Sequence, residues 1–486
     1  MRYALIYFFL FCFSFGNSQI RFNNYLTASD TINLDGGSNV IELKNHDFLS
    51  CGNVSAYFTT YSACYLVKTN PNGDTIWRKQ FDFAPNIGND VFTDLKELPD
   101  SNYLLVGTTY DSIIQNSDVF LAKIDTSGNL LWFKKYTHAD NDQSAELKLT
   151  PDGKVIIVGN SSPNPNTTYN DVLLIKTDLN GNLIWRKRFG DAFEEVYLTL
   201  EVVKNNTEYV LGGRHGYYST GNPYFDMSIM RTDTAGNIIW QQQYGTPSGN
   251  EPAGSVIQTL DSGFVFSGTY NNQGALLKIN KNGNQQWIKY YGLITNGWIA
   301  NVKQLLDSSF IMIASDIYAG NNKNTAHLIK ADKNGDQLWK RVYPNIVNRD
   351  NYFYGFNCTY DGGFIMTGMF VFGPAPYNNL WLVKTDSLGC DSVTCSYLVT
   401  DVKDISYELG EMSLAPNPTN GLLTISSPND FTKIELLSLT GQTLLSEIVN
   451  TKTHPIQLQN FAEGIYFVRV SYADEQSVMK KVIVSR

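Results

Sequence analysis

The chain has 486 residues, of which 43% are hydrophobic and only 17% are charged. This composition excludes extensive disorder, and the length leaves room for more than one domain. The formal net charge of −9 argues against a nucleic-acid partner, because phosphate binding needs a basic surface. After the N-terminal residues, no stretch approaches the roughly 18 apolar residues of a helical span, so we expect no membrane span in the mature protein.

The N-terminus has the pattern of a secretory signal peptide. Arg2 precedes a short apolar run over residues 4–15, and small residues follow at 16–18. A run of this length is too short to cross a bilayer and is typical of a cleaved export signal. We therefore predict a signal peptide over residues 1–18 and an exported protein.

A short phrase recurs seven times along the chain. It consists of a basic residue, any residue, Asp or Asn, two residues and Gly, and in the first six copies a Trp follows four residues after the Gly. The copies begin at Lys68, Lys123, Lys176, Arg231, Lys278, Lys330 and Lys384. A regular period of about 50 residues indicates a repeat architecture.

Each repeat contains four predicted strands, a to d. In the second repeat they cover residues 91–98, 103–107, 119–124 and 130–136. The Asp or Asn of the phrase opens the c–d turn, and the Gly takes the left-handed conformation there. The Trp lies on strand d, where its ring can fill the gap between adjacent sheets. Tandem four-stranded units predict an all-β fold, a β-propeller.

The repeat count predicts seven blades over residues 19–395. Sets of strands a, b and c begin near residues 38, 91, 144, 196, 254, 299 and 355. The seventh phrase has no strand d after it, whereas residues 21–25 resemble the strand d segment 132–136 and have no set before them. We predict that the N-terminal strand becomes strand d of the last blade, which closes the ring and removes its exposed edges.

The phrase resembles motifs of two propeller families. It is similar to the tryptophan-docking motif of quinoprotein-type propellers, with one residue fewer between Asp and Gly, and more faintly to the Asp-box of sialidases. In both families the motif is structural, so the resemblance implies no catalysis. A calcium site in the turns is not expected, because the side chains that would complete it are missing.

The cysteines allow two disulfides in an exported protein. Cys390 and Cys395 are close enough to close a small loop, and Cys51 and Cys64 lie near facing positions of one hairpin. The alternative is buried free thiols, which must hold for at least one of the five cysteines outside the signal peptide. We expect no metal at Cys390 and Cys395, because no histidine is near.

Around residue 400 the repeat ends, and a different module begins. Residues 396–411 read as a linker, and residues 412–486 as a small immunoglobulin-like β-sandwich. Its strands are predicted at 422–426, 433–439, 443–449, 455–458, 464–472 and 477–484.

The landmarks of this module resemble the type A C-terminal sorting domain of the type IX secretion system. They lie in the opening segment, the central turn and the last two strands, in the order of that family. The residues that carry the likeness are Pro416, Asn417, Pro418, Gly421, Gly441, Gly464, Tyr466, Lys480 and Lys481. The resemblance implies export through the periplasm and across the outer membrane, with the type IX machinery as partner. It also implies removal of the module, followed by release or attachment to the cell surface.

The sequence contains no recognisable catalytic motif. There is no nucleophile elbow, phosphate loop or paired metal-binding histidine motif, and no cofactor is expected. Asp191, Glu194 and Glu195 read as a solvated loop. We therefore predict a secreted or cell-surface binding protein for glycan or polymeric ligands, and not an enzyme. The alternative is a polysaccharide hydrolase or lyase, and a scaffolding role also stays open. Acidic residues in the central funnel would favour the enzyme, and aromatic and amide side chains would favour binding.

A propeller has two different faces. The a–b and c–d turns form one face, here called the turn face, and the b–c and d–a connections form the other, the loop face. The loop-face segments are long and varied: residues 53–62, 108–117, 160–171, 213–226, 316–325 and 369–379. Variable loops on a rigid scaffold often carry binding residues. The predicted ligand-binding aromatics are Tyr57, Tyr61, Tyr110, Tyr169, Tyr217, Tyr218, Tyr224, Trp298, Tyr318 and Tyr377.

Overall fold

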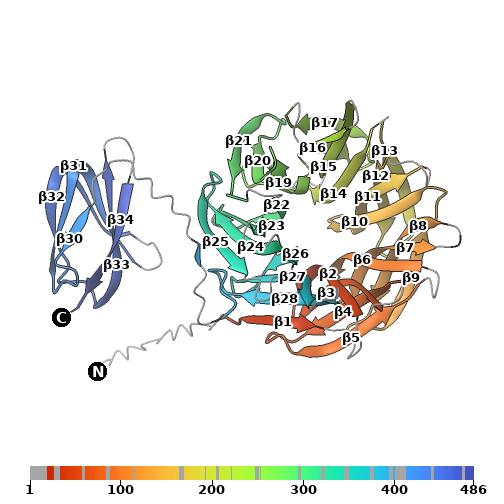
Figure 1. Cartoon of the computed structure of the whole chain (residues 1–486), viewed down its shortest axis with the longest axis horizontal. Coiled ribbons are helices and arrows are strands. Elements are labelled where there is room, and N and C mark those ends of the chain that lie inside the picture. Colours follow the sequence, from red (N-terminus) through yellow and green to blue (C-terminus); the bar gives the residue numbers. More distant parts are fainter. Residues whose placement is uncertain are drawn as a thin grey trace, which may run out of the picture. The chain divides into compact units, whose positions relative to one another are not determined.

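Figure 1 shows a computed structural model of the chain, coloured along the sequence. The structure describes residues 19–26, 33–56, 61–83, 88–111, 113, 115–163, 169–191, 193–203, 207–219, 222–246, 251, 253–293, 297–318, 323–343, 350–372, 377–392, 398–399, 412–438, 443–472 and 477–485. Internal contacts divide the chain into residues 1–401 and 402–486. The predicted signal peptide lies outside the described residues, and the predicted domain limits at 395 and 411 stay predictions.

The first unit is a seven-bladed β-propeller, as predicted (Figure 1). Blade 1 consists of β2 (Asn33–Glu42), β3 (Phe48–Ala56), β4 (Ala63–Thr69) and β5 (Thr75–Phe81). Blade 2 consists of β6 (Gly88–Glu97), β7 (Tyr103–Asp111), β8 (Asn116–Ile124) and β9 (Leu130–Tyr136). Blade 3 consists of β10 (Asn141–Thr150), β11 (Lys154–Ser162), β12 (Asp171–Asp178) and β13 (Leu183–Phe189). Blade 4 consists of β14 (Glu195–Val202), β15 (Glu208–Ser219), β16 (Asn222–Asp233) and β17 (Ile238–Tyr244).

The remaining blades follow the same order. Blade 5 consists of β18 (Ala253–Gln258), β19 (Phe264–Tyr270), β20 (Gln273–Ile279) and β21 (Gln285–Tyr290). Blade 6 consists of β22 (Trp298–Gln304), β23 (Phe310–Tyr318), β24 (Lys323–Ala331) and β25 (Gln337–Tyr343), with the short β29 (Leu398–Val399) on its outer edge. Blade 7 consists of β26 (Asn351–Cys358), β27 (Phe364–Phe372), β28 (Tyr377–Thr385) and β1 (Phe22–Leu26).

The N-terminal strand β1 closes the ring, as predicted. It pairs antiparallel with β28 and so becomes strand d of blade 7. The pairing places Phe22 opposite Lys384, just as Trp132 lies opposite Lys123 in blade 2. Phe22 therefore occupies the tryptophan position, one residue later than the sequence alignment of 21–25 with 132–136 indicated. The alignment was wrong because it matched residue types, whereas the register follows the buried face of the strand.

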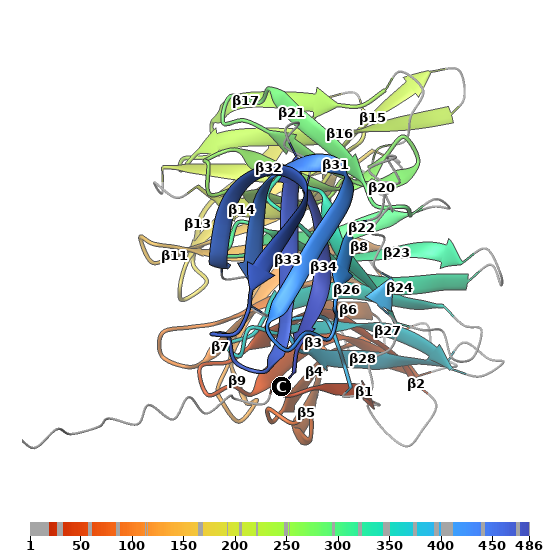
Figure 2. The same cartoon turned by 90° about the vertical axis from the view of Figure 1, so that its left-hand side faces the viewer.

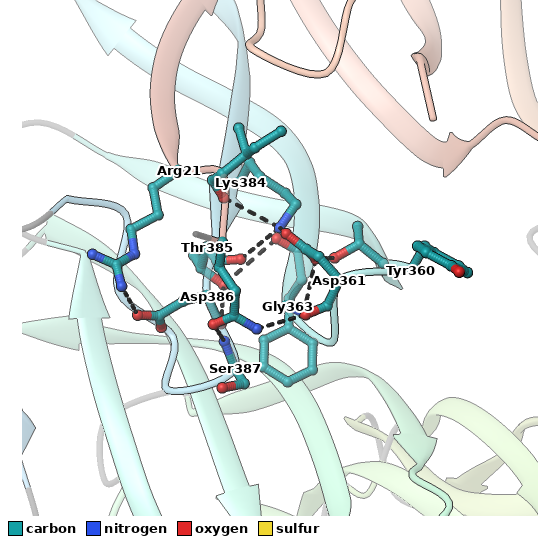
Figure 3. A network of polar contacts seen from close by, with 12 residues as sticks. Arg21, Tyr360, Asp361, Gly363, Lys384, Thr385, Asp386 and Ser387 are labelled. Atoms are coloured by element: carbon teal, nitrogen blue, oxygen red, sulfur yellow. Dashed lines mark hydrogen bonds and ion pairs between the residues drawn. The ribbon is translucent and has the colours of Figure 1, made fainter. Parts of the chain in front are cut away.

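Buried polar contacts reinforce this closure (Figure 3). The ammonium group of Lys384, only 2% exposed, lies 2.9 Å from a carboxylate oxygen of Asp361 and donates to the carbonyl of Ile20. Burial lowers the pKa of Lys384, while Asp361 opposes that shift. Arg21 of the N-terminal segment forms an ion pair of 2.7 Å with Asp386. The two ends of the propeller are thus joined by charge as well as by strand pairing.

The phrase of the repeat joins neighbouring blades. The glycine of each c–d turn has a positive φ, for example 75° at Gly181, and a Cβ there would come within 3.0 Å of the Trp132 ring of the preceding blade. The hydroxyl of Tyr136 also donates to the carbonyl of Gly181. The tryptophan therefore packs on the next blade's turn, as the sequence predicted, and only glycine leaves room for it.

The second unit is a β-sandwich built from five strands (Figure 2). They are β30 (Ser413–Ala415), β31 (Leu422–Leu437), β32 (Thr443–Gln457), β33 (Gly464–Tyr472) and β34 (Ser477–Val484). The first half of β31 pairs with β30 and the second half with β33, so one long strand serves both parts of the module. The sequence predicted separate strands at 422–426 and 433–439, and at 443–449 and 455–458. Each pair is instead one continuous strand, and the register between β31 and β32 shifts between Ser426 and Phe431, where the two halves join.

The predicted disulfide between Cys51 and Cys64 is not formed. Both residues are buried free thiols, because Cys64 lies opposite Asn53 and not opposite Cys51 in the β3–β4 pairing. Burial raises the pKa of both thiols. Cys390 is buried, and its predicted partner Cys395 lies outside the described residues, so that bridge stays a prediction.

Candidate functional site

Strand topology gathers the predicted aromatics at the loop face. Strand b ends, strand c begins and strand a begins at the same edge of each antiparallel blade, and the predicted side chains lie at these ends. Tyr61 and Tyr169 precede strands c and are 41% and 37% exposed. Tyr110 near the end of β7, Tyr224 near the start of β16 and Trp298 at the start of β22 are half-buried. The ring positions are therefore on one face, but their side chains differ in accessibility.

The other predicted aromatics are described less completely. The backbones of Tyr217, Tyr218, Tyr318 and Tyr377 lie in strands at the loop face, and the structure does not describe their side chains. Tyr57 lies outside the described residues. The segment 213–226, predicted to be a loop, is instead the end of the long β15–β16 hairpin, in which Tyr217 lies opposite Tyr224. The Gly and Tyr residues of this segment suggest a loop, but cross-strand pairing continues along the hairpin, so blade 4 extends beyond the neighbouring blades.

A cavity of about 440 Å³ follows the axis of the propeller. The innermost strand of every blade contributes to its wall, since β2, β6, β10, β14, β18, β22 and β26 all line it. Trp298 and Tyr354 bring aromatic rings to this cavity, and Asn39, Asn301 and Asn357 bring amides. Rings and amides of this kind suit the apolar faces and hydroxyl groups of sugars.

A β-bulge at the same place in every innermost strand shapes this wall. In four places the polar side chain after the bulge accepts a main-chain N–H of the next blade. These bonds run from Leu147 to Asp94 (3.0 Å), Leu200 to Glu146 (2.8 Å), Val256 to Thr199 (2.9 Å) and Val302 to Ser255 (3.0 Å). The carboxylates of Asp94 and Glu146 therefore connect blades, because a bulge leaves an N–H without a ladder partner.

Lysines neutralise the acids of the cavity wall. Lys96 lies 2.8 Å from Asp94, and Lys148 lies 2.8 Å from Glu146 and 3.6 Å from Glu201. Burial alone would lower the pKa of Lys148, but Glu146 and Glu201 hold it above its ordinary value. The carboxylates of Asp94 and Glu146 thus bind an ammonium group and a main-chain N–H group at the same time.

A further lysine lies on the blade 6 side of the cavity. Lys303 sits over the ring of Phe356, with 5.5 Å from its ammonium nitrogen to the ring centre. Burial lowers its pKa, and the positive charge of Lys148 adds to that effect. The cavity wall therefore combines three lysines with two acids, Asp94 and Glu146, and has no excess of negative charge.

Sequence reasoning missed two tyrosines beside the cavity. Tyr352 and Tyr354 of β26 have their rings stacked at 5.9 Å, and Tyr354 is 41% exposed. The hydroxyl of Tyr352 accepts a bond from the Asn324 amide, and burial, followed by Asp350, raises its pKa to about 12. They lie in a strand and not in a variable loop, so the length of the loops gave no indication of them. The alternation of tyrosines at the start of an innermost strand is a signal that could have identified them.

The reading of Asp191, Glu194 and Glu195 as a solvated loop was wrong for two of the three residues. Glu194 and Glu195 are buried, whereas Asp191 is exposed. Glu194 forms an ion pair of 2.9 Å with Arg214, and Glu195 lies opposite His215. Their partners come from β15, about twenty residues later, which is why local polarity was misleading.

The sorting landmarks hold the second unit together. The Asn417 side chain donates to the carbonyl of Lys481 and accepts the N–H of Ile483, which ties the opening segment to the last strand. The hydroxyl of Tyr466 donates to the carbonyl of Ala462. Pro416, Pro418, Lys480 and Lys481 are exposed, Gly421 is buried, Gly464 begins β33, and Gly441 lies outside the described residues.

Comparison with known families identifies this unit. Residues 413–485 match the family model described as "Secretion system C-terminal sorting domain". The chain therefore carries a type IX sorting domain, which directs export across the outer membrane to the cell surface or extracellular space. Among the described residues, no helix has the length and apolar character needed to cross a membrane. A comparison with curated proteins gives no match.

Several solved structures resemble the chain at low identity. PorZ, a surface component of the type IX secretion system of Porphyromonas gingivalis, matches 92% of this chain at 11% identity and a TM-score of 0.34. This chain spans about half of PorZ, since the match covers 51% of it. A virginiamycin B lyase of Staphylococcus aureus matches 75% of this chain and 98% of its own, at 11% identity and a TM-score of 0.47. An α-L-arabinanase of Penicillium chrysogenum matches 76% and 98%, at 14% identity and a TM-score of 0.44. At such values the activities of these proteins are not transferred to this chain.

Proposed function

We propose that the propeller is an exported binding module for glycans or similar polymeric ligands, and that it engages them at the loop face and the adjoining end of the axial cavity. The observation that supports this most is the composition of the cavity wall. Trp298 and Tyr354 offer rings, and Asn301 offers an amide, all from blades 6 and 7. Stacking and amide hydrogen bonds together can hold a sugar chain without chemistry.

The state of the acidic residues favours binding over hydrolysis. A glycosidase uses a pair of carboxylates that take and give protons or attack the sugar. Asp94 and Glu146 instead accept main-chain N–H bonds from the next blade and pair with Lys96 and Lys148. Replacing either acid would disturb the ring of blades, so we assign them to the scaffold and keep the hydrolase or lyase as the second candidate.

A depletion assay tests the proposal. The full chain is mixed with insoluble or immobilised polysaccharides, and both the protein left in solution and the sugars released are measured. We expect depletion by at least one polysaccharide without soluble products. Trp298→Ala should abolish depletion, and Tyr360→Ala should not, because Tyr360 is 82% exposed but lies in an a–b turn on the opposite face.

Two outcomes would decide against this assignment. Release of soluble oligosaccharides that stops in a carboxylate variant would establish the enzyme instead. Equal loss of depletion in Trp298→Ala and Tyr360→Ala, with both variants folded, would mean that binding is not located at the loop face.

A further inference from the structure

Three consecutive blades place a row of polar residues across strands a, b and c at the loop face. In each row the three residues are direct cross-strand neighbours. The rows are Asp90–Thr109–Asp118 in blade 2, Asp142–Ser161–Asp171 in blade 3 and Glu195–His215–Asp226 in blade 4. Blade 4 therefore keeps both acids but has a histidine where the other two blades have a hydroxyl group.

The counter-charge of the row is also different in blade 4. In blade 2, Lys135 of strand d forms an ion pair of 3.1 Å with Asp118, and in blade 3, Arg188 does so with Asp171 at 3.1 Å. Both cations lie three residues after the tryptophan of strand d. The same position in blade 4 is Gln243, which carries no charge. Blade 4 has thus lost the cation that balances this row in its neighbours.

The third acid of blade 4 comes from the d–a connection. His215 is 3% exposed, and its Nε2 lies 3.3 Å from Oδ2 of Asp191 and 3.5 Å from Oε1 of Glu195. One ligand atom from each of the three residues lies within 4.8 Å of the others. The side chain of Asp191 is 53% exposed, so the cluster opens to solvent on one side.

These separations suit a shared metal ion. Two protein ligands that each lie about 2.1 Å from a tetrahedral or octahedral ion are about 3.0–3.4 Å apart. The two histidine–carboxylate distances are close to that range and are long for hydrogen bonds. A divalent cation would offset the negative charge that the carboxylates of Asp191 and Glu195 place around the buried His215.

We propose that Asp191, Glu195 and His215 form a site for a divalent transition-metal ion of the Zn²⁺ type, with solvent in the remaining positions. An imidazole nitrogen with carboxylate oxygens favours such an ion over Mg²⁺ or Ca²⁺, which prefer oxygen ligands alone. The ion replaces the strand d cation of blades 2 and 3 and ties the connection between blades 3 and 4 to strands a and b of blade 4. This inference does not depend on the proposed function.

The direct test is metal titration of the full chain, prepared without a polyhistidine tag and stripped with a chelator. Calorimetry should show one equivalent of Zn²⁺ bound, with Ca²⁺ at least tenfold weaker, and Zn²⁺ should raise the melting temperature. His215→Gln and Asp191→Asn should each weaken Zn²⁺ binding at least tenfold. His327→Gln is the matched control, since His327 is also buried but, among the described residues, is paired with the single carboxylate of Asp316, at 2.7 Å.

A fourth variant tests the reason for the site. Gln243→Arg restores the cation of blade 3, so it should weaken Zn²⁺ binding at least tenfold and raise the melting temperature of the metal-free protein. Asp191 is exposed, so Asp191→Asn still decides the question if His215→Gln fails to fold. Absence of stoichiometric Zn²⁺ binding by the natural chain, or unchanged affinity in both Asp191→Asn and Gln243→Arg, would overturn the proposal.

Discussion

The turn face and the loop face of the propeller are made by the same strands, yet they differ in how much they repeat. On the turn face, the side-chain oxygen of the first residue in all seven c–d turns accepts the main-chain N–H groups two and four positions later. Asp125, Asp178 and Asn280 are examples. On the loop face, the b–c connection changes from the extended β15–β16 hairpin of blade 4 to the tight turn at Asn271 and Asn272 of blade 5.

This difference separates the scaffold from the surface that is free to vary. The turn-face contacts join neighbouring blades, since five of the six repeat tryptophans lie against the glycine of the next turn, so a change there affects two blades at once. The loop-face connections also contact the next blade where strand c begins, for example by the bond from the N–H of Glu195 to the carbonyl of Asn170, but their lengths and sequences differ from blade to blade. We therefore expect turn-face changes to cost stability and loop-face changes to cost binding.

The largest loss of stability is expected on removal of β1, because this strand supports both faces. Removing β1 exposes the partners of Phe22 and Leu26, which are buried, and leaves Lys384 and Asp361 without their cover. Loss of these two side chains alone should lower the free energy of unfolding by about 4 kcal/mol or more. Thermal unfolding measures it.

A matched control for this deletion exists in blade 6. Leu398→Gly with Val399→Gly weakens β29, which adds to a blade that is already complete, and should change the melting temperature little. Equal melting temperatures for the β1 deletion and the natural chain would refute closure by the N-terminal strand.

Next in size is the loss of one turn-face carboxylate. Asp178→Ala removes the acceptor of the Asn180 and Asn182 N–H groups and should lower the free energy of unfolding by about 1–2 kcal/mol, with ligand binding unchanged. Denaturant unfolding and the depletion assay report the two quantities separately. Weaker binding at unchanged stability would contradict the division between the faces.

A loop-face ring should show the opposite behaviour. Tyr169→Ala removes a ring that is 37% exposed, so the melting temperature should stay within about 1–2 °C while affinity falls by up to about tenfold. Tyr360→Ala on the turn face serves as the control for removal of an exposed tyrosine. A melting temperature that falls sharply in Tyr169→Ala would mean that this ring packs its own loop.

The smallest expected effect concerns pH. The hydrogen bond from the N–H of Asn182 holds the pKa of Asp178 below its ordinary value. The hydrogen bond from the N–H of Asn237 lowers the pKa of Asp233 in the same way. Near pH 4 and below, the unfolded chain therefore binds more protons than the folded chain at these sites, so stability falls as the pH drops. Asp178→Asn keeps the turn, as Asn70 and Asn280 do elsewhere, and should make the acid loss shallower. An identical pH profile from acid titration would argue against this contribution.

Much of the scaffold could be predicted, because the residues that join neighbouring blades belong to the short repeated sequence phrase. Gly181 and Trp132 meet across blades, but each also sits at a fixed offset within its own repeat, so the period reveals both. Closure followed from the missing last strand. The register of β1 could not be predicted in the same way, because the packing of Phe22 against the Gly73 turn depends on a partner fifty residues away.

The candidate site was predicted only in outline. Topology placed the aromatics on one face, but the cavity wall depends on seven strands that meet at the axis, and no local pattern places Tyr354 or Asn357 in one cavity with Trp298. Burial of Glu195 depends on His215 of the adjacent strand. Residues whose role comes from distant partners leave little trace in sequence spacing.

Hydrogen exchange on the full chain, with and without a bound polysaccharide, tests the central assignment most directly. We expect slower exchange in peptides that contain the starts of β22 and β26 and the connections at the loop face, with the c–d turns unchanged. Protection confined to the c–d turns, with the loop face unchanged, would contradict it.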